Sequence, residues 1–424
     1  MKAADMKLVA GVDDDDGSKQ LQPGISRTSR ISVQASLSWQ SNEATHIDSQ
    51  FIGNLNIWRD YFPPEIQHRL EGCARGSTIS HDLSAGEALP GFSSAEVHTV
   101  KPQQFNRHFS SQLELEPRLG RFYPQGLFEN IPGNNSSNYQ PCRIIGLDDD
   151  SITTDFNHPL AAKPLTLDMR IMNIWDAGQE HGGRCNDIVE MLATNGPGMQ
   201  ARYDDIATDF WTDDAFARAD TSVDELFYSQ PRLVDHLDQS CSQQIGELYK
   251  QLLPHDGEIL DLMSSWVSHL PDGFSAARIT GLGMNRHELE QNPRLDESLV
   301  HDLNRQPELP FEDQVFDGIA CTASIEYLVS PAAVFSELAR ILKPGAPLVI
   351  TFTNRWFPPK AILAWGHAHE FERIGLVLEY FFENGLFENL HSYSLRGLPR
   401  PQNDKYADRL PLSDPVYAVW GTRR

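Results

Sequence analysis

The sequence predicts a chain of two domains, a mainly antiparallel β domain followed by a doubly wound α/β domain. Residues 31–39 and 165–174 alternate apolar and polar side chains with a period of two, which is typical of strands in an antiparallel sheet. After Pro254, short apolar runs alternate with segments of helical spacing. This order indicates a mainly parallel sheet that helices cover on both faces.

The composition changes along the chain divide it into four parts. The length of 424 residues also agrees with more than one domain, at about 150 residues per domain. The predicted parts are a disordered tail (residues 1–30), the β domain (31–178), a linker with helices (179–222) and the α/β domain (223–424).

The charge balance excludes two classes of partner. The chain has 59 acidic and 35 basic residues, a formal net charge of -24. Such a surface repels phosphate backbones and anionic lipids, so we expect neither a nucleic-acid nor a membrane partner. No apolar run approaches the roughly 20 residues that span a bilayer, and the first residues lack the apolar core of a signal peptide. A cytoplasmic location is therefore expected.

The cysteines predict no metal site. The five are scattered, and no pair has the C-x-x-C spacing that favours zinc. Neither a metal centre nor a disulfide framework is expected.

The α/β part predicts a ligand site at one edge of its sheet. Ligands of open α/β sheets bind beyond the carboxyl ends of the strands. The loop after Leu262, the turn after Leu282 and the segment after Ala320 should therefore line the site. The predicted strands are residues 258–262, 278–282, 316–320 and 347–352, and the predicted helix before the last strand is residues 331–342.

These segments, taken in order, resemble a known family. Residues 258–269, 279–285, 301–313 and 316–328 and the Leu342-Lys-Pro-Gly345 stop are similar to the motifs of type-11-like class I S-adenosylmethionine-dependent methyltransferases. The resemblance covers most of residues 223–424. It implies S-adenosylmethionine as the cofactor and methyl transfer to an unknown acceptor.

The resemblance also implies which residues hold the cofactor. The acidic residue after the first strand and the loop behind it would bind the methionine end, and a later pair would bind the adenine. These residues are Asp261, Met263, Ser264 and Ser265 for the methionine end, and Asp302 and Leu303 for the adenine.

Two positions depart from the family pattern. Residues 264–269 contain no glycine, although glycine lets a backbone approach a ligand closely. Gly283 stands where the family has an acidic residue for the ribose, and Asn285 would be a weaker neutral partner. If Gly283 is a lost carboxylate, Gly283→Asp should tighten cofactor binding, which is the outcome we favour. If the backbone needs positive φ there, the same change should weaken binding.

The acceptor side is predicted from polar residues near the same edge. A helix over residues 227–236 would place Arg232 and His236 on one face, and His269 would face them from the loop. Either histidine titrates near neutrality and would serve as a general base. The alternative is that these histidines only pack or cap.

The β part resembles a different family. Asn157-His-Pro-Leu-Ala161, followed by an alternating strand, and Leu89-Pro-Gly91 are similar to segments of SlyD-type FKBP prolyl isomerases. The resemblance covers residues 31–177 and implies a flap insertion at about 107–153 that binds proline-containing or unfolded polypeptides. Such enzymes desolvate the prolyl imide in an apolar cleft. The implied cleft residues are Asp48, Leu89, Phe105 and Leu167.

Two functions follow. The first is a methyltransferase with an isomerase or chaperone module. The alternative is a prolyl isomerase or chaperone-like binding protein whose second domain is a degenerate scaffold. The glycine-free loop at residues 264–269 is the feature that discriminates between them.

Overall fold

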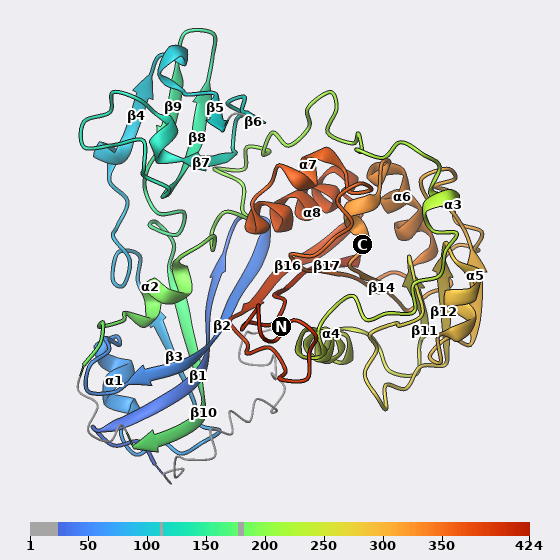
Figure 1. Cartoon of the computed structure of the whole chain (residues 1–424), viewed down its shortest axis with the longest axis horizontal. Helices are drawn as coiled ribbons and strands as arrows, with labels where there is room; N and C mark the ends of the chain where they lie inside the picture. The colour runs from blue at the N-terminus through green and yellow to red at the C-terminus, as the bar shows by residue number, and fades with distance from the viewer. Residues whose placement is uncertain (1–23, 111–112, 177–181) are drawn as a thin grey trace.

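A single mixed sheet of eleven strands runs across the molecule in the computed structural model (Figure 1). The structure describes residues 24–110, 113–176 and 182–424. In spatial order the strands are β13 (Glu297–Val300), β12 (Arg278–Gly283), β11 (Glu258–Leu262), β14 (Gly318–Thr322), β15 (Pro347–Phe352), β17 (Val416–Arg423), β16 (Phe387–Arg396), β2 (Ala44–Asn56), β1 (Ser29–Gln40), β10 (Leu165–Asp176) and β3 (Thr78–Leu83).

The parallel part of the sheet contains a topological switch point. Strands β11 to β15 are parallel, and the chain order β13-β12-β11 reverses where β11 lies beside β14. Strand β17 is antiparallel to β15, and β16 is antiparallel to β17. The predicted strands are confirmed, except that the third begins at Gly318 rather than at residue 316.

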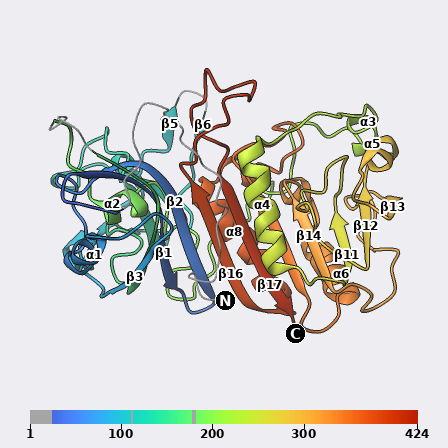
Figure 2. The same cartoon turned by 90° about the horizontal axis from the view of Figure 1, so that it is seen from below.

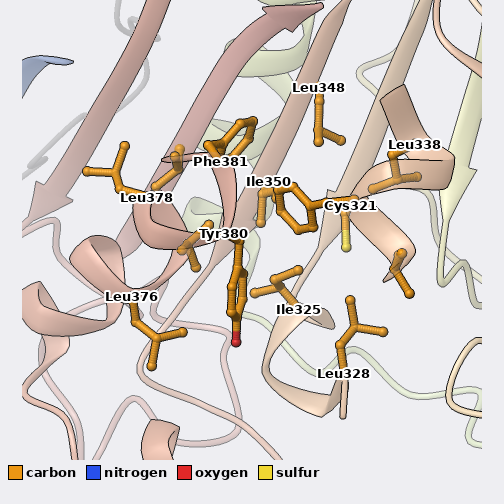
Figure 3. Close-up of a cluster of buried hydrophobic side chains, with 14 of the residues drawn as sticks. Cys321, Ile325, Leu328, Leu338, Leu348, Ile350, Leu376, Leu378, Tyr380 and Phe381 are labelled. Carbon is orange, nitrogen blue, oxygen red and sulfur yellow. The ribbon is translucent and has the colours of Figure 1, made fainter. Parts of the chain in front are cut away.

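Alternate side chains of these strands enter two different apolar layers. Ile259 and Val349 pack on the layer that contains α4 (Gln239–Leu252), whereas Leu260 and Ile350 pack on the layer of α6 (Pro331–Ile341) and α8 (Glu370–Asn384). Figure 2 shows α4 on one face and α8 on the other, and Figure 3 shows part of the second layer around Ile325 and Phe381. The helices are α1 (Pro64–Leu70), α2 (Ile188–Ala193), α3 (Asp224–Phe227), α4 (Gln239–Leu252), α5 (Arg286–Gln291), α6 (Pro331–Ile341), α7 (Leu363–Gly366) and α8 (Glu370–Asn384).

The N-terminal strands form the other end of the sheet. Strand β1 lies between β2 and β10, and its apolar residues from Ile31 to Trp39 pack with α1 and α2 in one cluster. The disordered tail was predicted to extend to residue 30, which is wrong, because the chain already packs on the protein at Ile25. Ile25 is 3% exposed, its amide donates to the Cys73 carbonyl, and β1 already begins at Ser29. Residues 1–23 lie outside the described part of the chain.

Between β3 and β10 the chain forms a second sheet of its own. It comprises β4 (Val97–Val100), β9 (Ile152–Asp155), β8 (Pro141–Leu147) and β7 (Phe122–Pro124), with a small pair β5 (His108–Ser110) and β6 (Leu113–Glu114) beside it. The short 3-10 helices are η2 (Ser94–Glu96), η3 (Pro102–Gln104), η4 (Gln125–Leu127) and, in the α/β half, η5 (Ile325–Tyr327). The insertion was predicted at residues 107–153, but the sheet that it forms begins earlier, at Val97, and ends later, at Asp155.

The two halves are not separate domains in the sense that the sequence predicted. Strand β2 pairs in parallel with β16, so the sheet continues from one half into the other. Without β2, the N–H and C=O groups of β16 would form an open edge. Polar side chains also cross the seam, because His46 Nδ1 lies 2.7 Å from Ser392 Oγ and Ser394 Oγ donates to Asp48 Oδ1 at 3.0 Å.

The predicted linker is largely a packed segment. Residues 177–181 lie outside the described part of the chain. Beyond them, Ile188 and Leu192 pack on the β-half cluster, and Phe210 and Ala215 pack on the α/β cluster. The segment therefore fills space between the halves instead of connecting them through solvent.

Three further properties concern the described residues only. All five cysteines are free thiols. The described side chains include no group of three or more His, Cys, Asp or Glu that could hold a metal ion. Across residues 24–110, 113–176 and 182–424, none of the helices is both long enough and apolar enough to cross a membrane.

Candidate functional site

A cavity of about 820 Å³ opens at the carboxyl ends of β11, β12 and β14. This is the switch point of the sheet, where open α/β folds bind ligands, and the volume lies in the range of small-molecule sites. Every residue predicted for the cofactor or the acceptor side lines it: Asp261, Met263, Ser264, Ser265, Gly283, Asn285, Asp302, Leu303, Arg232, His236 and His269.

Asp261 lies at the base of the cavity, one residue before β11 ends. Its side chain is 3% exposed, and Ser264 Oγ donates a hydrogen bond of 2.5 Å to its carboxylate. Desolvation by burial raises the pKa of Asp261 to about 7, against the opposing effect of the Ser264 and Ser268 hydroxyls. A buried carboxylate that ionises near neutrality is suited to a cationic partner.

The loop after β11 turns sharply although it contains no glycine. Met263 has φ 56° and His269 has φ 54°, both in the left-handed region that side chains other than glycine adopt at a cost. The Ser264 amide donates to the Leu282 carbonyl at 2.7 Å, which holds the loop against β12. Met263 and His269 therefore adopt left-handed conformations that glycine would adopt at a lower free-energy cost.

Gly283 is required by a close backbone contact. A Cβ built at this position would lie 2.1 Å from the Ser264 carbonyl oxygen, and Gly283 is not among the glycines with positive φ. The favoured prediction of a lost carboxylate is therefore wrong, and so is the positive-φ explanation. The glycine allows the loop after β11 to approach the end of β12.

Asn285 has a structural role that the sequence did not predict. It is the N-cap of α5, where its Oδ1 accepts from the Glu288 amide at 3.1 Å and its Nδ2 donates to the Tyr228 carbonyl at 2.8 Å. Its amide is thus engaged within the protein, which argues against the predicted contact with a ribose.

Glu288 lines the cavity and was not predicted. It accepts from Ser265 Oγ at 2.8 Å and from the Arg232 amide at 2.6 Å, so it joins both sides of the cavity mouth. Asn285 and Glu288 have the spacing of an N-cap and an acidic residue three positions later, which is typical of a helix N-terminus. This spacing was the sequence signal that could have directed attention to Glu288.

Asp302 and Leu303 form a turn at the edge of the cavity. Asp302 Oδ1 accepts from the amides of Asn304 at 2.9 Å and Arg305 at 3.2 Å. Leu303 is 4% exposed and belongs to the large apolar cluster of the sheet. The pair places one carboxylate and one apolar side chain at the edge of the cavity.

The helix predicted over residues 227–236 is wrong. Helix α3 ends at Phe227, and the chain then runs irregularly to Asp238. Pro231 has no N–H for a helical hydrogen bond, and the Arg232 amide is held by Glu288 instead. Arg232 and His236 nevertheless both line the cavity.

The two histidines differ in their surroundings. Burial lowers the pKa of His269 to about 4, and its buried Nδ1 has no hydrogen-bond partner among the described residues. Loss of water in the cavity also lowers the pKa of His236, whose ring meets the Phe357 ring edge-on at 5.4 Å. His236 is more open than His269 and can meet a ligand directly.

A long connection between β16 and β17 completes the wall. Asn403, Asp404 and Lys405 from this connection line the cavity. Arg400 fixes the connection, because its buried guanidinium donates to Asp414 at 2.6 Å and lies 3.4 Å from Asp238, the N-cap of α4. This wall could not be predicted from the sequence, since its residues lie more than 130 positions after the predicted loop.

The four predicted isomerase residues are all buried. Leu89 and Leu167 lie in the cluster under β1, whereas Phe105 packs on Phe128 in the inserted sheet. Asp48 is 1% exposed and accepts from Trp39, Gln200 and Ser394. Isomerase activity stays a prediction that rests on the sequence resemblance.

Comparisons with known proteins agree on the C-terminal region. Residues 265–350 match the model of a family described as a methyltransferase domain. Methyltransferase GfsG of Streptomyces halstedii is 25% identical over 137 residues, which are 29% of this chain and 48% of that protein. Methyltransferase phqN of Penicillium fellutanum is 35% identical over 79 residues, 17% of this chain and 24% of that protein. The chain therefore spans less than half the length of either curated relative.

Among solved structures, a putative methyltransferase from Bacillus halodurans C-125 aligns with 42% of this chain and 96% of its own at 14% identity, with a TM-score of 0.30. The sequence matches, and not this structural likeness, show that the C-terminal region contains a methyltransferase domain.

Proposed function

We propose that this methyltransferase domain binds S-adenosylmethionine and methylates an acceptor in the cavity at the switch point. The observation that carries the proposal is the convergence of all the predicted cofactor residues on that one cavity, with Asp261 at its base. Segments separated by tens of residues come together there, at the edge where α/β sheets bind ligands.

The residues present fit this cofactor. Asp261 offers a carboxylate to the amino group of the methionine end, and the buried Nδ1 of His269 is an unused polar atom in the same wall. Asp302 and Leu303 fit the adenine, and the Glu288 carboxylate offers the ribose hydroxyls a charged acceptor where Asn285 offers only a neutral one. When bound, the cofactor supplies a methyl group on a sulfonium.

The chain's own contribution is positioning and proton transfer. Methyl transfer needs little covalent help, so the walls act mainly by holding the acceptor in line. The lowered pKa of His236, caused by desolvation in the cavity, keeps its imidazole neutral at pH 7. His236 can then take the proton that a hydroxyl or amine acceptor loses.

Thermal shift with S-adenosylhomocysteine tests the proposal. The wild-type chain should be stabilised in proportion to the logarithm of ligand concentration. Asp261→Asn should lose most of that shift, whereas Asp272→Asn, at an exposed position outside the cavity, should keep it. Wild-type affinity should also rise from pH 6 to pH 8, because Asp261 must lose its proton to attract the ammonium.

The absence of any shift in the wild type at millimolar ligand would contradict the proposal. An equal loss in both variants would instead contradict the role of Asp261.

A further inference from the structure

One wall of the cavity is aromatic. The Phe357 ring packs edge-on against Phe227 at 5.7 Å and lies nearly parallel to the Tyr327 ring at 6.0 Å. The Phe357 amide donates to the Tyr327 hydroxyl at 2.8 Å, which fixes the two rings relative to each other. Trp356 and Tyr228 continue the wall. Rigid rings of this kind are suited to a flat, unsaturated ligand.

Two cations in this part of the cavity have no carboxylate partner in the described chain. The Arg232 guanidinium lies 4.5 Å from the Phe227 ring and 5.3 Å from the Phe357 ring, and its Nη2 donates only to the Phe227 carbonyl, at 3.0 Å. Lys405 is exposed, and its Nζ lies 5.1 Å from the Tyr406 ring.

Several carboxylates of the same wall pair with cations other than Arg232 and Lys405. Asp224 lies 2.9 Å from Arg218 and 3.2 Å from Lys360. Asp238 and Asp404 each lie 3.4 Å from Arg400. Other carboxylates that line the cavity have no cation partner among the described residues: Asp235, Asp261, Glu288 and Asp302. None of them pairs with the Arg232 guanidinium, which remains beside the rings for a ligand anion.

We propose that the acceptor is an aromatic compound with an acidic group, whose ring packs on Phe357 and whose anion pairs with Arg232. The proposal rests on the proposed function and names the substrate class of the same site. Guanidinium groups that already stack on aromatic rings hold planar carboxylates well. The net charge of -24 opposes anions at long range, but salt screens that repulsion beyond about 8 Å.

Calorimetry on the full chain saturated with S-adenosylhomocysteine provides the test. The probes are 4-hydroxybenzoate, its neutral analogue 4-hydroxybenzamide, and the cationic tyramine. The carboxylate should bind about tenfold or more tighter than the amide, as one charge-assisted pair implies. Tyramine should bind most weakly.

Arg232→Gln should reduce the preference for the carboxylate to less than about threefold while the chain still binds S-adenosylhomocysteine. Arg286→Gln is the matched control, because it removes the same charge from an exposed position near the cavity that does not line it. This control should keep the preference.

Three results would overturn the proposal: equal or tighter binding of the amide or the amine, no binding of any aromatic probe, or equal effects of the two variants. Binding of S-adenosylhomocysteine is measured first, and its failure would count against the proposed function alone. The three aromatic probes would then be titrated into the chain without S-adenosylhomocysteine. The same order of affinities would be expected there, and the same results would overturn the proposal.

Discussion

Gly283 and Asp261 show how single residues shape the cavity. Gly283 allows the Ser264 carbonyl to approach β12, and Asp261 places a buried carboxylate beside the same loop. Both residues could be selected from the sequence, because strand ends in α/β folds carry ligand residues. The reason why position 283 needs a glycine could not be predicted, since it depends on the Ser264 carbonyl oxygen, 19 positions earlier in the chain.

Substitution of Gly283 should damage the fold and the site together. A Cβ 2.1 Å from a backbone oxygen forces the loop after β11 to move, so Gly283→Ala should lower the free energy of unfolding by about 1–3 kcal/mol. S-adenosylhomocysteine should also bind more weakly. Gly366→Ala, where a Cβ meets nothing within 4 Å, is the control for urea unfolding and for calorimetry. Tighter binding by Gly283→Asp would restore the lost-carboxylate account.

Asp261 should lower the stability of the ligand-free protein at high pH. Its folded-state pKa of about 7 lies above the ordinary value of 3.8, so the folded state holds the proton more tightly than the unfolded state. The free energy of unfolding should therefore fall by roughly 1.4 kcal/mol per pH unit between these values, and level off above pH 7. Asp261→Asn should remove that fall.

The difference in Tm between Asp261→Asn and the wild type should consequently grow from pH 4.5 to pH 8. Asp272→Asn should show no such trend. A constant difference across this range would mean that Asp261 is not protonated near neutrality.

At the scale of elements, local pattern predicted the strands and one helix well. The runs that became β11, β12 and β15 are short, apolar and bounded by turns, which suffices for buried parallel strands. The helix predicted over residues 227–236 does not form, and Leu233 within it is 42% exposed. Pro231 interrupts the helical hydrogen bonds in this segment, because proline has no backbone N–H.

The seam between β2 and β16 could not be predicted, because its strands are more than 300 residues apart. Asp48 was selected for an isomerase cleft, and the structure gives it a different role. Its carboxylate accepts from Trp39 Nε1 at 2.9 Å, Gln200 Nε2 at 3.1 Å and Ser394 Oγ at 3.0 Å. Three donors from three segments therefore depend on one buried acceptor.

Removal of that acceptor should be costly. Asp48→Ala leaves the three donors buried without a partner, and the free energy of unfolding should fall by about 3 kcal/mol or more. Asp48→Asn keeps one oxygen acceptor and should cost less. Asp149→Ala, on an exposed turn, should change stability by less than about 0.5 kcal/mol. Urea unfolding measures all three, and an Asp48→Ala variant as stable as Asp149→Ala would contradict this role.

At the scale of the whole molecule, the continuous sheet makes the two halves interdependent. The segment of residues 182–222 packs on both apolar clusters, and β2 covers the edge of β16. A fragment of residues 223–424 would expose that edge and lose the packing of Phe210 and Ala215.

The full chain should therefore unfold in one calorimetric transition, and the 223–424 fragment should aggregate or melt at a lower temperature, because open strand edges promote association. Two well-resolved transitions, or a fragment as stable as the full chain, would show instead that the halves fold independently.

The isomerase prediction is also a question for the whole molecule. Because Asp48, Leu89, Phe105 and Leu167 are all buried, the full chain should not accelerate refolding of a proline-limited substrate above the uncatalysed rate. Phe105 and Leu167 stand where the resembled family has tyrosine and phenylalanine, but the Phe105→Tyr plus Leu167→Phe variant should not gain activity either, since neither side chain meets solvent. Catalysis by the wild type would show that the cleft opens in solution.

A crystal structure of the full chain with S-adenosylhomocysteine tests the central claim most directly. Density for the ligand should fill the cavity at the ends of β11 and β12, with its amino group within hydrogen-bonding distance of Asp261 and its adenine against Leu303. A cavity that stays empty at saturating ligand, or density bound at another place, would contradict the account.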